Sequence, residues 1–342
     1  MEHIAIDLGS RESQICVRNE SGKILDEARY RTAELKEYLA KRAPGARGLL
    51  ESSAEAFAVA DWAGECGHQA LVVPSSLVRA LGVGERGLKN DQRDARKVSE
   101  MDCRMKVPSV HIPSRLRREH QARVTARQAL VQTRTKLVNT VRSLLRMMAL
   151  PPVRATPKTL PSGVRRLLGE SPDGLPDYVE RLLTTIEQLN EQIAGADKEI
   201  ATIANTDPVC QLLQTMPGVG PVTGVCFASA IDNVGRFDNA SKLTSYLGLT
   251  PGESTTGFKT RRTSMTKAGS GRARWTLNQA AWSMVRTRPN DPLVQWFQQV
   301  AARRGKKVAI TALCRKMAGT LYAMWRDGQP YNPAKAAAHN DA

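Results

Sequence analysis

No apolar run in the 342 residues approaches the length of a membrane-spanning segment. A helix needs about 20 consecutive apolar residues to cross the hydrocarbon layer of a bilayer. The N-terminus also lacks the basic start and apolar stretch of a signal peptide. We therefore expect a cytoplasmic protein that has no membrane partner.

The patterns that bind zinc or form disulfide frameworks are missing as well. The six cysteines are scattered without a Cys-x-x-Cys pair, and the five histidines are equally dispersed. Both kinds of site need closely spaced ligands or paired cysteines. We expect buried free thiols instead.

Acidic residues are outnumbered by basic ones. The chain has 50 lysines and arginines against 33 aspartates and glutamates, which gives a formal net charge of +17 and a pI near 9.9. Such an excess favours polyanions and salt-sensitive phosphate contacts, but it does not separate DNA from RNA or from an acidic protein. The length allows two or three domains. The composition therefore fits a multidomain protein that acts on nucleic acid.

Four carboxylates have the positions that a metal-dependent nuclease requires. Asp7 and Glu51 each end a short apolar run, and Asp91 and Asp94 lie three residues apart near the start of a predicted helix, where they share a face. Two Mg²⁺ ions about 3.5–4 Å apart need oxygen ligands of this kind. We predict that the four acids are catalytic and bind Mg²⁺ or Mn²⁺ beside a phosphodiester. Singly, each could instead cap a turn or helix.

Other acids near these positions are interpreted as surface charges. They are Glu12, Glu55, Glu100 and Asp102. Glu55 is the replacement that we would choose if Glu51 is misplaced.

The N-terminal region has the pattern of an α/β domain. Three strand-like runs follow one another and predict a meander, and a strand, a helix and another strand come next. The predicted ranges are 3–7, 14–18, 23–30, 48–51, 55–62 (the helix) and 69–74. A meander followed by alternating helix and strand is the order of ribonuclease-H-like domains.

Long helices are predicted for the middle of the chain. One starts at Pro113-Ser114, after which the chain runs to about 148 without proline or glycine, and another spans 178–204, with apolar residues recurring at three, four and seven. The segment 150–175 is rich in proline and glycine and predicts a linker with a short helix at 164–168. An antiparallel coiled-coil hairpin or a dimer interface explains both long helices. Arg127 and Arg134 lie on a broad basic face of the first, which either contacts nucleic acid or is a solvated face of a packing helix.

A glycine-rich turn precedes a small apolar run. Pro217-Gly218-Val219-Gly220 is followed by residues 221–230, and this order resembles a helix-hairpin-helix motif. In that motif, backbone N–H groups of the turn and of the next helix bind phosphate. Gly218 and Gly220 are therefore candidate nucleic-acid contacts. The alternative is a turn between two core helices.

Hydroxyl and cationic side chains gather between residues 248 and 275. We expect a flexible loop over 248–262 that carries a nucleophile. A hydroxyl that attacks phosphorus needs cations to stabilise the phosphate oxygens. The hydroxyl residues include Ser254, Thr255, Thr256 and Thr260, and the cations are Lys259, Arg261, Arg262, Lys267, Arg272 and Arg274. The alternative is a phosphate-binding loop with no covalent role.

These motifs together resemble one known family. Asp7, Leu50-Glu51 and the segment 89–96 resemble the DEDD signature of the Piv/MooV-type DNA invertases and of the insertion-sequence transposases of family one-hundred-and-ten. The segments 217–220, 246–251 and 266–269 resemble the C-terminal transposase domain of that family. The resemblance covers nearly the whole chain.

The resemblance implies an architecture and a mechanism. It implies a RuvC-like DEDD domain over 1–108, a helical coiled-coil region over 109–205, a mainly α transposase domain over 206–332 and a tail over 333–342. It also implies a serine that becomes covalently linked to DNA, with the DEDD acids of a partner protomer holding Mg²⁺ beside it. The implied partners are donor and target DNA, a structured non-coding (bridge) RNA, and further protomers in a dimer that assembles to a tetramer. The implied setting is the bacterial cytoplasm, at the nucleoid during activity.

One departure from the family pattern leaves the nucleophile open. The serine of the family directly precedes a glycine, whereas here Thr256 precedes Gly257 and Ser254 lies two residues upstream. The β-methyl group of threonine stiffens χ1 and crowds an in-line attack. Either Thr256 or Ser254 acts, or this copy has lost strand transfer. A catalytically silent DNA- and RNA-binding relic and a Holliday-junction-type nuclease that uses water remain as alternative functions.

Overall fold

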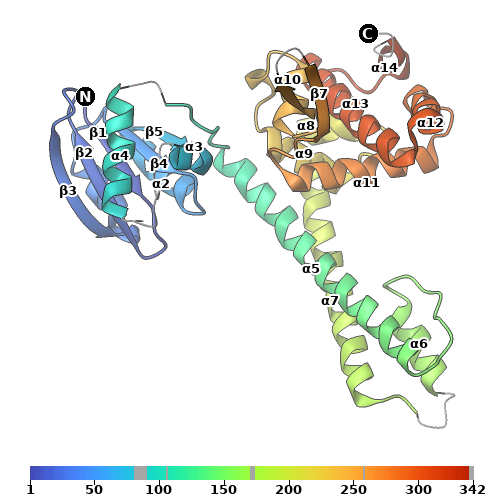
Figure 1. The fold of residues 1–342 in the computed structure, drawn as a ribbon. Coiled ribbons are helices and arrows are strands. Elements are labelled where there is room, and N and C mark those ends of the chain that lie inside the picture. The colour runs from blue at the N-terminus through green and yellow to red at the C-terminus, as the bar shows by residue number, and fades with distance from the viewer. Residues whose placement is uncertain (81–90, 105–106, 170–173, 257–258, 339–342) are drawn as a thin grey trace. The chain divides into compact units, whose positions relative to one another are not determined.

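A five-stranded mixed sheet organises Met1–Pro113, the first of two structural units in the computed structural model (Figure 1). The structure describes residues 1–80, 91–104, 107–169, 174–256 and 259–338. The strands are β1 (His3–Asp7), β2 (Glu12–Arg18), β3 (Ile24–Arg31), β4 (Arg47–Glu51) and β5 (Gln69–Val73). Their order across the sheet is β3-β2-β1-β4-β5, with β1 to β3 antiparallel and β4 and β5 parallel to β1. The α/β character predicted for this region is confirmed.

Helices cover both faces of this sheet because its central strands are apolar on both sides. Ile4 and Ile6 pack with α1 (Leu35–Ala40) and α2 (Ala56–Glu65), whereas Ala5 between them belongs to the core under α4 (Asp91–Arg104). The same alternation separates Leu50 from Leu49, as the two-residue period of a strand requires. The helices are η1 (Thr32–Glu34), α1 (Leu35–Ala40), α2 (Ala56–Glu65), α3 (Ser75–Ala80) and α4 (Asp91–Arg104).

A buried polar cluster fixes α4 on the sheet. The Nδ1 atom of His3 lies 2.5 Å from the Oδ2 atom of Asp102, whose side chain is fully buried. The Nε atom of Arg47 lies 3.4 Å from the other carboxylate oxygen, as an ion pair rather than an aligned hydrogen bond. The interpretation of Asp102 as a surface charge is therefore wrong. Its carboxylate is buried because the imidazole of His3 and the guanidinium of Arg47, at the starts of β1 and β4, offset its desolvation.

Ser114–Ala342 forms the second unit and is mainly helical. Its helices and strands are α5 (Arg115–Met147), α6 (Leu160–Gly169), α7 (Asp177–Thr206), α8 (Pro208–Gln214), α9 (Pro221–Ile231), η3 (Val234–Arg236), α10 (Ala240–Tyr246), β6 (Pro251–Thr256), β7 (Lys259–Met265), α11 (Gly271–Thr287), α12 (Pro292–Arg304), α13 (Lys306–Asp327) and α14 (Pro333–Ala338). The predicted helical character of the C-terminal region is confirmed. The beginning of the expected tail forms α14, and residues 339–342 lie outside the described residues.

The long helices α5 and α7 pack side by side and antiparallel (Figure 1). At one end they share an apolar core with α6, where Val141, Leu183 and Val164 are fully buried. At the other end Val124 and Ile200 join the core of the C-terminal helices. The long helices therefore belong to the same unit as the C-terminal region.

The C-terminal core closes around α9, whose small apolar residues are buried on almost every side. Phe227 is fully buried there.

All six cysteines are free, and burial raises the pKa of the Cys210 and Cys314 thiols to about 12. No helix within the described ranges combines the length and apolar character needed to cross a membrane.

We predict that replacing Asp102 with alanine loosens α4 from the sheet. The change leaves the buried imidazole of His3 and the buried Nε atom of the half-buried Arg47 without their carboxylate, and the expected loss in stability is about 3 kcal/mol. Hydrogen exchange of the amides of β1 and α4 in the full-length protein measures this loss. The control is Glu100→Ala on the same helix, because that acid forms an exposed ion pair with Arg104 and should contribute about 0.3–0.5 kcal/mol. Equal exchange in the two variants would contradict the prediction.

Candidate active site

Asp7 and Glu51 lie at the same edge of the sheet. Ile6 of β1 is paired with Leu50 of the parallel strand β4, and each acid is the next residue along its strand. Neighbouring strands lie about 4.8 Å apart. Both acids are partly exposed. The parallel register thus brings two carboxylate-bearing residues, distant in sequence, to neighbouring positions.

The start of α4 reaches the same edge. Asp102 lies beside His3 at the beginning of β1. Three residues earlier in the helix, Ser99 contacts Cys16. Cys16 pairs with Ala5, which lies two residues farther along β1 than His3. The helix therefore runs antiparallel to β1. The eight residue steps of the helix from Asp102 back to Asp94 span about 12 Å.

The stretch of β1 from His3 to Asp7 has almost the same length as this stretch of α4. The four residue steps of β1 from His3 to Asp7 span about 13 Å. The backbone of Asp94 is therefore level with Asp7, and that of Asp91 lies almost one turn beyond. The side chains of Asp91 and Asp94 lie outside the described part of the structure.

The donor chemistry at this edge suits a hard divalent cation. Asp7 and Glu51 offer carboxylate oxygens, the ligands that Mg²⁺ and Mn²⁺ prefer. Among the described side chains there is no group of three or more His, Cys, Asp or Glu residues placed to hold a metal. The structure brings together the carboxylates of Asp7 and Glu51 and the helix start that carries Asp91 and Asp94. Glu55 is the residue before α2.

The segment expected to be a flexible loop contains a β-hairpin, so that prediction is wrong. β6 and β7 pair antiparallel, with Ser254 opposite Arg261 and Thr256 opposite Lys259 in the register. Threonine is favoured in strands because its branched side chain suits a pleated surface, and the run of hydroxyl residues supports pairing rather than a loop. The side chains of 254–262 and the residues 257–258 lie outside the described structure.

Two glycines allow a close backbone crossing at the base of this hairpin. Gly248 has φ +67°, and a Cβ atom there would lie 2.0 Å from the carbonyl oxygen of Ala268. Gly269 has φ +72°, and its Cβ would lie 2.0 Å from the carbonyl oxygen of Tyr246. Only glycine fits both positions. The two glycine-containing motifs at 246–251 and 266–269 are thus two halves of one crossing.

Cationic residues near the crossing have different roles. Arg274 donates to the carbonyl oxygens of Leu247 (3.0 Å) and Ala268 (2.8 Å), so it braces the backbone. Lys267 has φ +55° and an exposed side chain. Of these two, Lys267 is the one available to a phosphate.

The glycine turn between α8 and α9 is partly explained by packing. Gly218 has φ +85°, and a Cβ atom there would lie 2.3 Å from the carbonyl oxygen of Ala280 in α11. This close approach accounts for Gly218 without a ligand. Gly220 precedes α9, and nothing lies within 4 Å of the Cβ position there. The two helices predicted around the turn are present, and Gly220 is the member of the pair with open space beside it.

The structure uses the predicted basic face of α5 for packing within the chain. Arg127 forms an ion pair with Asp197, and Arg134 donates to the Oδ1 atom of Asn190 at 2.9 Å. Arg272 donates from Nε to the Oε1 atom of Gln128 in α5 at 2.7 Å. The polar partners of Arg127 and Arg134 lie on α7. The sequence of α5, which contains few acids, therefore does not indicate these pairs.

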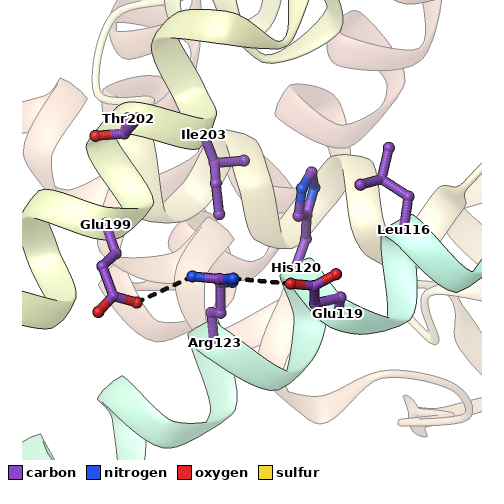
Figure 2. A pocket seen from close by; sticks show the side chains of 7 residues that line it. All are labelled: Leu116, Glu119, His120, Arg123, Glu199, Thr202 and Ile203. Atoms are coloured by element: carbon purple, nitrogen blue, oxygen red, sulfur yellow. Dashed lines mark hydrogen bonds and ion pairs between the residues drawn. The ribbon is translucent and has the colours of Figure 1, made fainter.

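A shallow pocket of about 270 Å³ lies between α5 and α7. Figure 2 shows Arg123 between two carboxylates, with hydrogen bonds to Glu119 (2.7 Å) and Glu199 (3.1 Å). Both acids of the pocket are therefore already paired. His120, which also lines the pocket, is buried, and burial together with nearby Arg117 lowers its pKa. The pocket holds a structural ion-pair network rather than a catalytic set.

Two transposase families match this sequence over most of its length. Residues 4–149 match a transposase family of the DEDD type named after IS110. Residues 210–294 match the family described as transposase IS116/IS110/IS902. The first range contains Asp7, Glu51, Asp91 and Asp94, and the second contains the β6–β7 hairpin.

Curated relatives are similar over nearly the whole chain. The transposase for insertion sequence element IS1111A of Coxiella burnetii is 25% identical over 96% of this chain and 90% of its own length. The transposase for IS1328 of Yersinia enterocolitica is 26% identical, over 96% and 98% respectively. A probable family 20 transposase of Pseudomonas aeruginosa is 24% identical, over 97% and 99%.

We predict that His120 makes the second unit less stable at acidic pH. Its pKa is lowered in the folded chain, so below the ordinary value of about 6.5 the unfolded chain binds a proton that the folded chain does not. The free energy of unfolding therefore falls as pH falls from about 6.5, until the lowered pKa is reached. Urea denaturation at pH 7.5 and pH 5.5 should show a smaller pH-dependent loss in His120→Leu than in the unaltered protein. Equal losses would contradict this assignment.

Proposed function

The chain belongs to the IS110/IS116/IS902 family of transposases, and from this premise we propose that it is a site-specific DNA recombinase with a RuvC-like acidic centre and a separate hydroxyl nucleophile. The observation that carries the proposal is the meeting of Asp7, Glu51 and the start of α4 at one sheet edge. The strand order β3-β2-β1-β4-β5, with its meander followed by parallel strands, supports a ribonuclease-H-like fold for this unit.

The acidic centre would hold the metal. Asp7, Glu51, Asp91 and Asp94 are the proposed ligands of Mg²⁺ or Mn²⁺. Bound there, the cation would offset the negative charge that develops on the phosphate oxygens during strand cleavage. The acids themselves orient the cation and the scissile phosphate, and their fixed positions on β1, β4 and α4 keep the geometry constant.

The hairpin would supply the nucleophile. In the proposed step, the hydroxyl of Thr256 or Ser254 loses its proton and attacks the phosphorus of the DNA backbone. A phosphoester bond to the protein forms, the bond to one DNA oxygen breaks, and that oxygen takes up a proton. Attack by a DNA hydroxyl then reverses the exchange and releases the protein. Thr256 is the last residue of β6, next to Gly257, and Ser254 lies two residues farther into the strand.

Charged and glycine-containing segments around the hairpin would hold nucleic acid. Lys267 is exposed beside the crossing, and Gly220 lies at the start of α9 with open space around it. Lys259, Arg261 and Arg262 belong to β7. The predicted contacts of Gly218, Arg272, Arg127 and Arg134 have packing roles in the structure and are weaker candidates.

The proposal extends to the assembly. Donor and target DNA would be matched through a structured non-coding RNA, and α5 and α7 would form a coiled-coil interface in a dimer that assembles to a tetramer. The acids of one protomer would then act beside the nucleophile of its partner. The exposed apolar residues Leu116 and Met147, at opposite ends of α5, support a further contact of this helix.

The threonine before Gly257 favours a second candidate function. If its hydroxyl does not attack, the acidic centre can activate water, and the protein is then a Holliday-junction-type nuclease that leaves no adduct. A silent DNA- and RNA-binding relic would show neither reaction. The three functions differ in measurable products.

We predict a covalent protein–DNA adduct. The protein, Mg²⁺, the non-coding RNA flanking its element and labelled donor and target DNA are incubated, denatured and separated on a gel. Thr256→Ala or Ser254→Ala should abolish the adduct, because alanine lacks the attacking oxygen, and the variant that does so identifies the nucleophile. Thr256→Ser should retain it. Cleaved DNA without any adduct would support the water-using nuclease, and bound but intact DNA the silent relic.

We also predict that Asp7→Asn and Glu51→Gln lower DNA cleavage by about 100-fold or more, because each removes a charged ligand from the centre. Binding of Mn²⁺, measured by electron paramagnetic resonance without DNA, should weaken in the same variants. Glu12→Gln is the control, since Glu12 is an exposed acid paired with Arg29 on the same sheet. Unchanged Mn²⁺ binding in both site variants would contradict the acidic centre.

A further inference from the structure

Four cations gather at the turn between α12 and α13, a segment with no role in the chemistry proposed above. They are Arg303, Arg304, Lys306 and Lys307, and all four are exposed. Gly305 separates the two pairs and has φ +81°. We refer to these four residues as the α12–α13 basic turn. It lies beyond residue 294, where the second family match ends.

Among the residues that the structure describes, the basic turn has no acidic partner. No aspartate or glutamate occurs between Asp291 and Asp327. Across the described residues, none of the ion pairs includes any of the four cations. By contrast, Arg123, Arg127 and Arg165 are all paired with acids within the second unit. Part of the excess positive charge of the chain is therefore exposed and unneutralised at this turn.

The position of two of the cations is electrostatically unfavourable for the folded chain alone. Lys306 and Lys307 lie in the first turn of α13, a helix of 22 residues. Cations are disfavoured at a helix N-terminus because the helix dipole is positive there. No side chain caps this N-terminus. A bound anion would reverse the unfavourable interaction and accept hydrogen bonds from the first N–H groups of the helix.

The turn is presented on a rigid support. Leu293 and Phe297 of α12, and Ala309 and Leu313 of α13, are buried in the C-terminal core. The two helices pack directly against each other. The backbone that carries the cations is therefore held in place by the packing of both helices, which lowers the backbone entropy lost when the turn binds a ligand.

We propose that the α12–α13 basic turn binds the phosphate backbone of double-stranded DNA and holds the DNA without reading its sequence. Closely spaced exposed cations without acids match the regular negative charge of duplex DNA. The inference rests only on the part of the proposed function by which the chain acts on DNA. It does not depend on which hydroxyl is the nucleophile.

The test is the salt dependence of DNA binding. Binding of a labelled 30-base-pair duplex of random sequence is measured by fluorescence anisotropy from about 50 to 300 mM KCl, without divalent cations, so that no strand is cut. Each phosphate contact adds about 0.9 to the slope of log K against log salt concentration. Replacing all four cations with alanine should lower the slope by about 2 or more and weaken binding about tenfold or more at 100 mM KCl.

Matched variants separate a direct contact from a general loss of charge. Arg303→Ala with Arg304→Ala and Lys306→Ala with Lys307→Ala should each lower the slope. The control, Lys23→Ala with Lys41→Ala, removes the same charge from exposed positions of the first unit and should leave the slope nearly unchanged. Arg303→Lys with Arg304→Lys should retain it, because charge rather than shape is required. Circular dichroism shows whether each variant is folded.

Two results would overturn the proposal. One is a folded fourfold variant that binds the DNA duplex with the slope and affinity of the control. The other is a slope that falls only for an RNA duplex of the same sequence, which would assign the turn to RNA. The adduct gel reports on the proposed function separately, because a chain that forms no adduct can still show the predicted change in slope.

Discussion

The parallel pairing of β1 with β4 is the constraint on which the candidate active site depends. It places Asp7 and Glu51, which are 44 positions apart in the chain, at neighbouring strand ends. The pairing is stabilised by apolar residues on both faces of the strands, Ile4 and Leu50 on one and Ala5 and Leu49 on the other. A register slip by one residue would exchange the two faces of a strand and turn its acid away from the face that α4 covers. The core of the sheet therefore fixes the position of the acids.

The attachment of α4 depends on the opposite end of the same sheet. The buried carboxylate of Asp102 meets His3 and Arg47 at the starts of the two central strands. Because a helix and a strand are both regular, fixing one end of α4 also fixes the level of its other end, where the remaining two acids begin the helix. The two ends of this domain thus have different tasks. One end anchors the helix, and the other carries the proposed metal ligands.

The second unit distributes its charge in two ways. Along α5, arginines are paired with acids and amides of α7, so they hold the two long helices together. At the α12–α13 basic turn, four cations have no acidic partner among the described residues. Net charge alone does not distinguish these cases, because a cation paired inside the chain contributes little to the attraction of a polyanion. The tertiary structure separates structural cations from available ones.

The sequence by itself determined the strands that end in acids, the long helices and the glycine-containing motifs, because these depend on local periodicity and on the special backbone freedom of glycine. It did not determine that Asp102 is buried, that the segment around Ser254 pairs as a hairpin, or that Arg127 and Arg134 face α7. Each of these depends on a partner far away in the chain. Burial, strand pairing and ion pairing are decided by tertiary contacts, since the free energy of a polar group depends on what surrounds it.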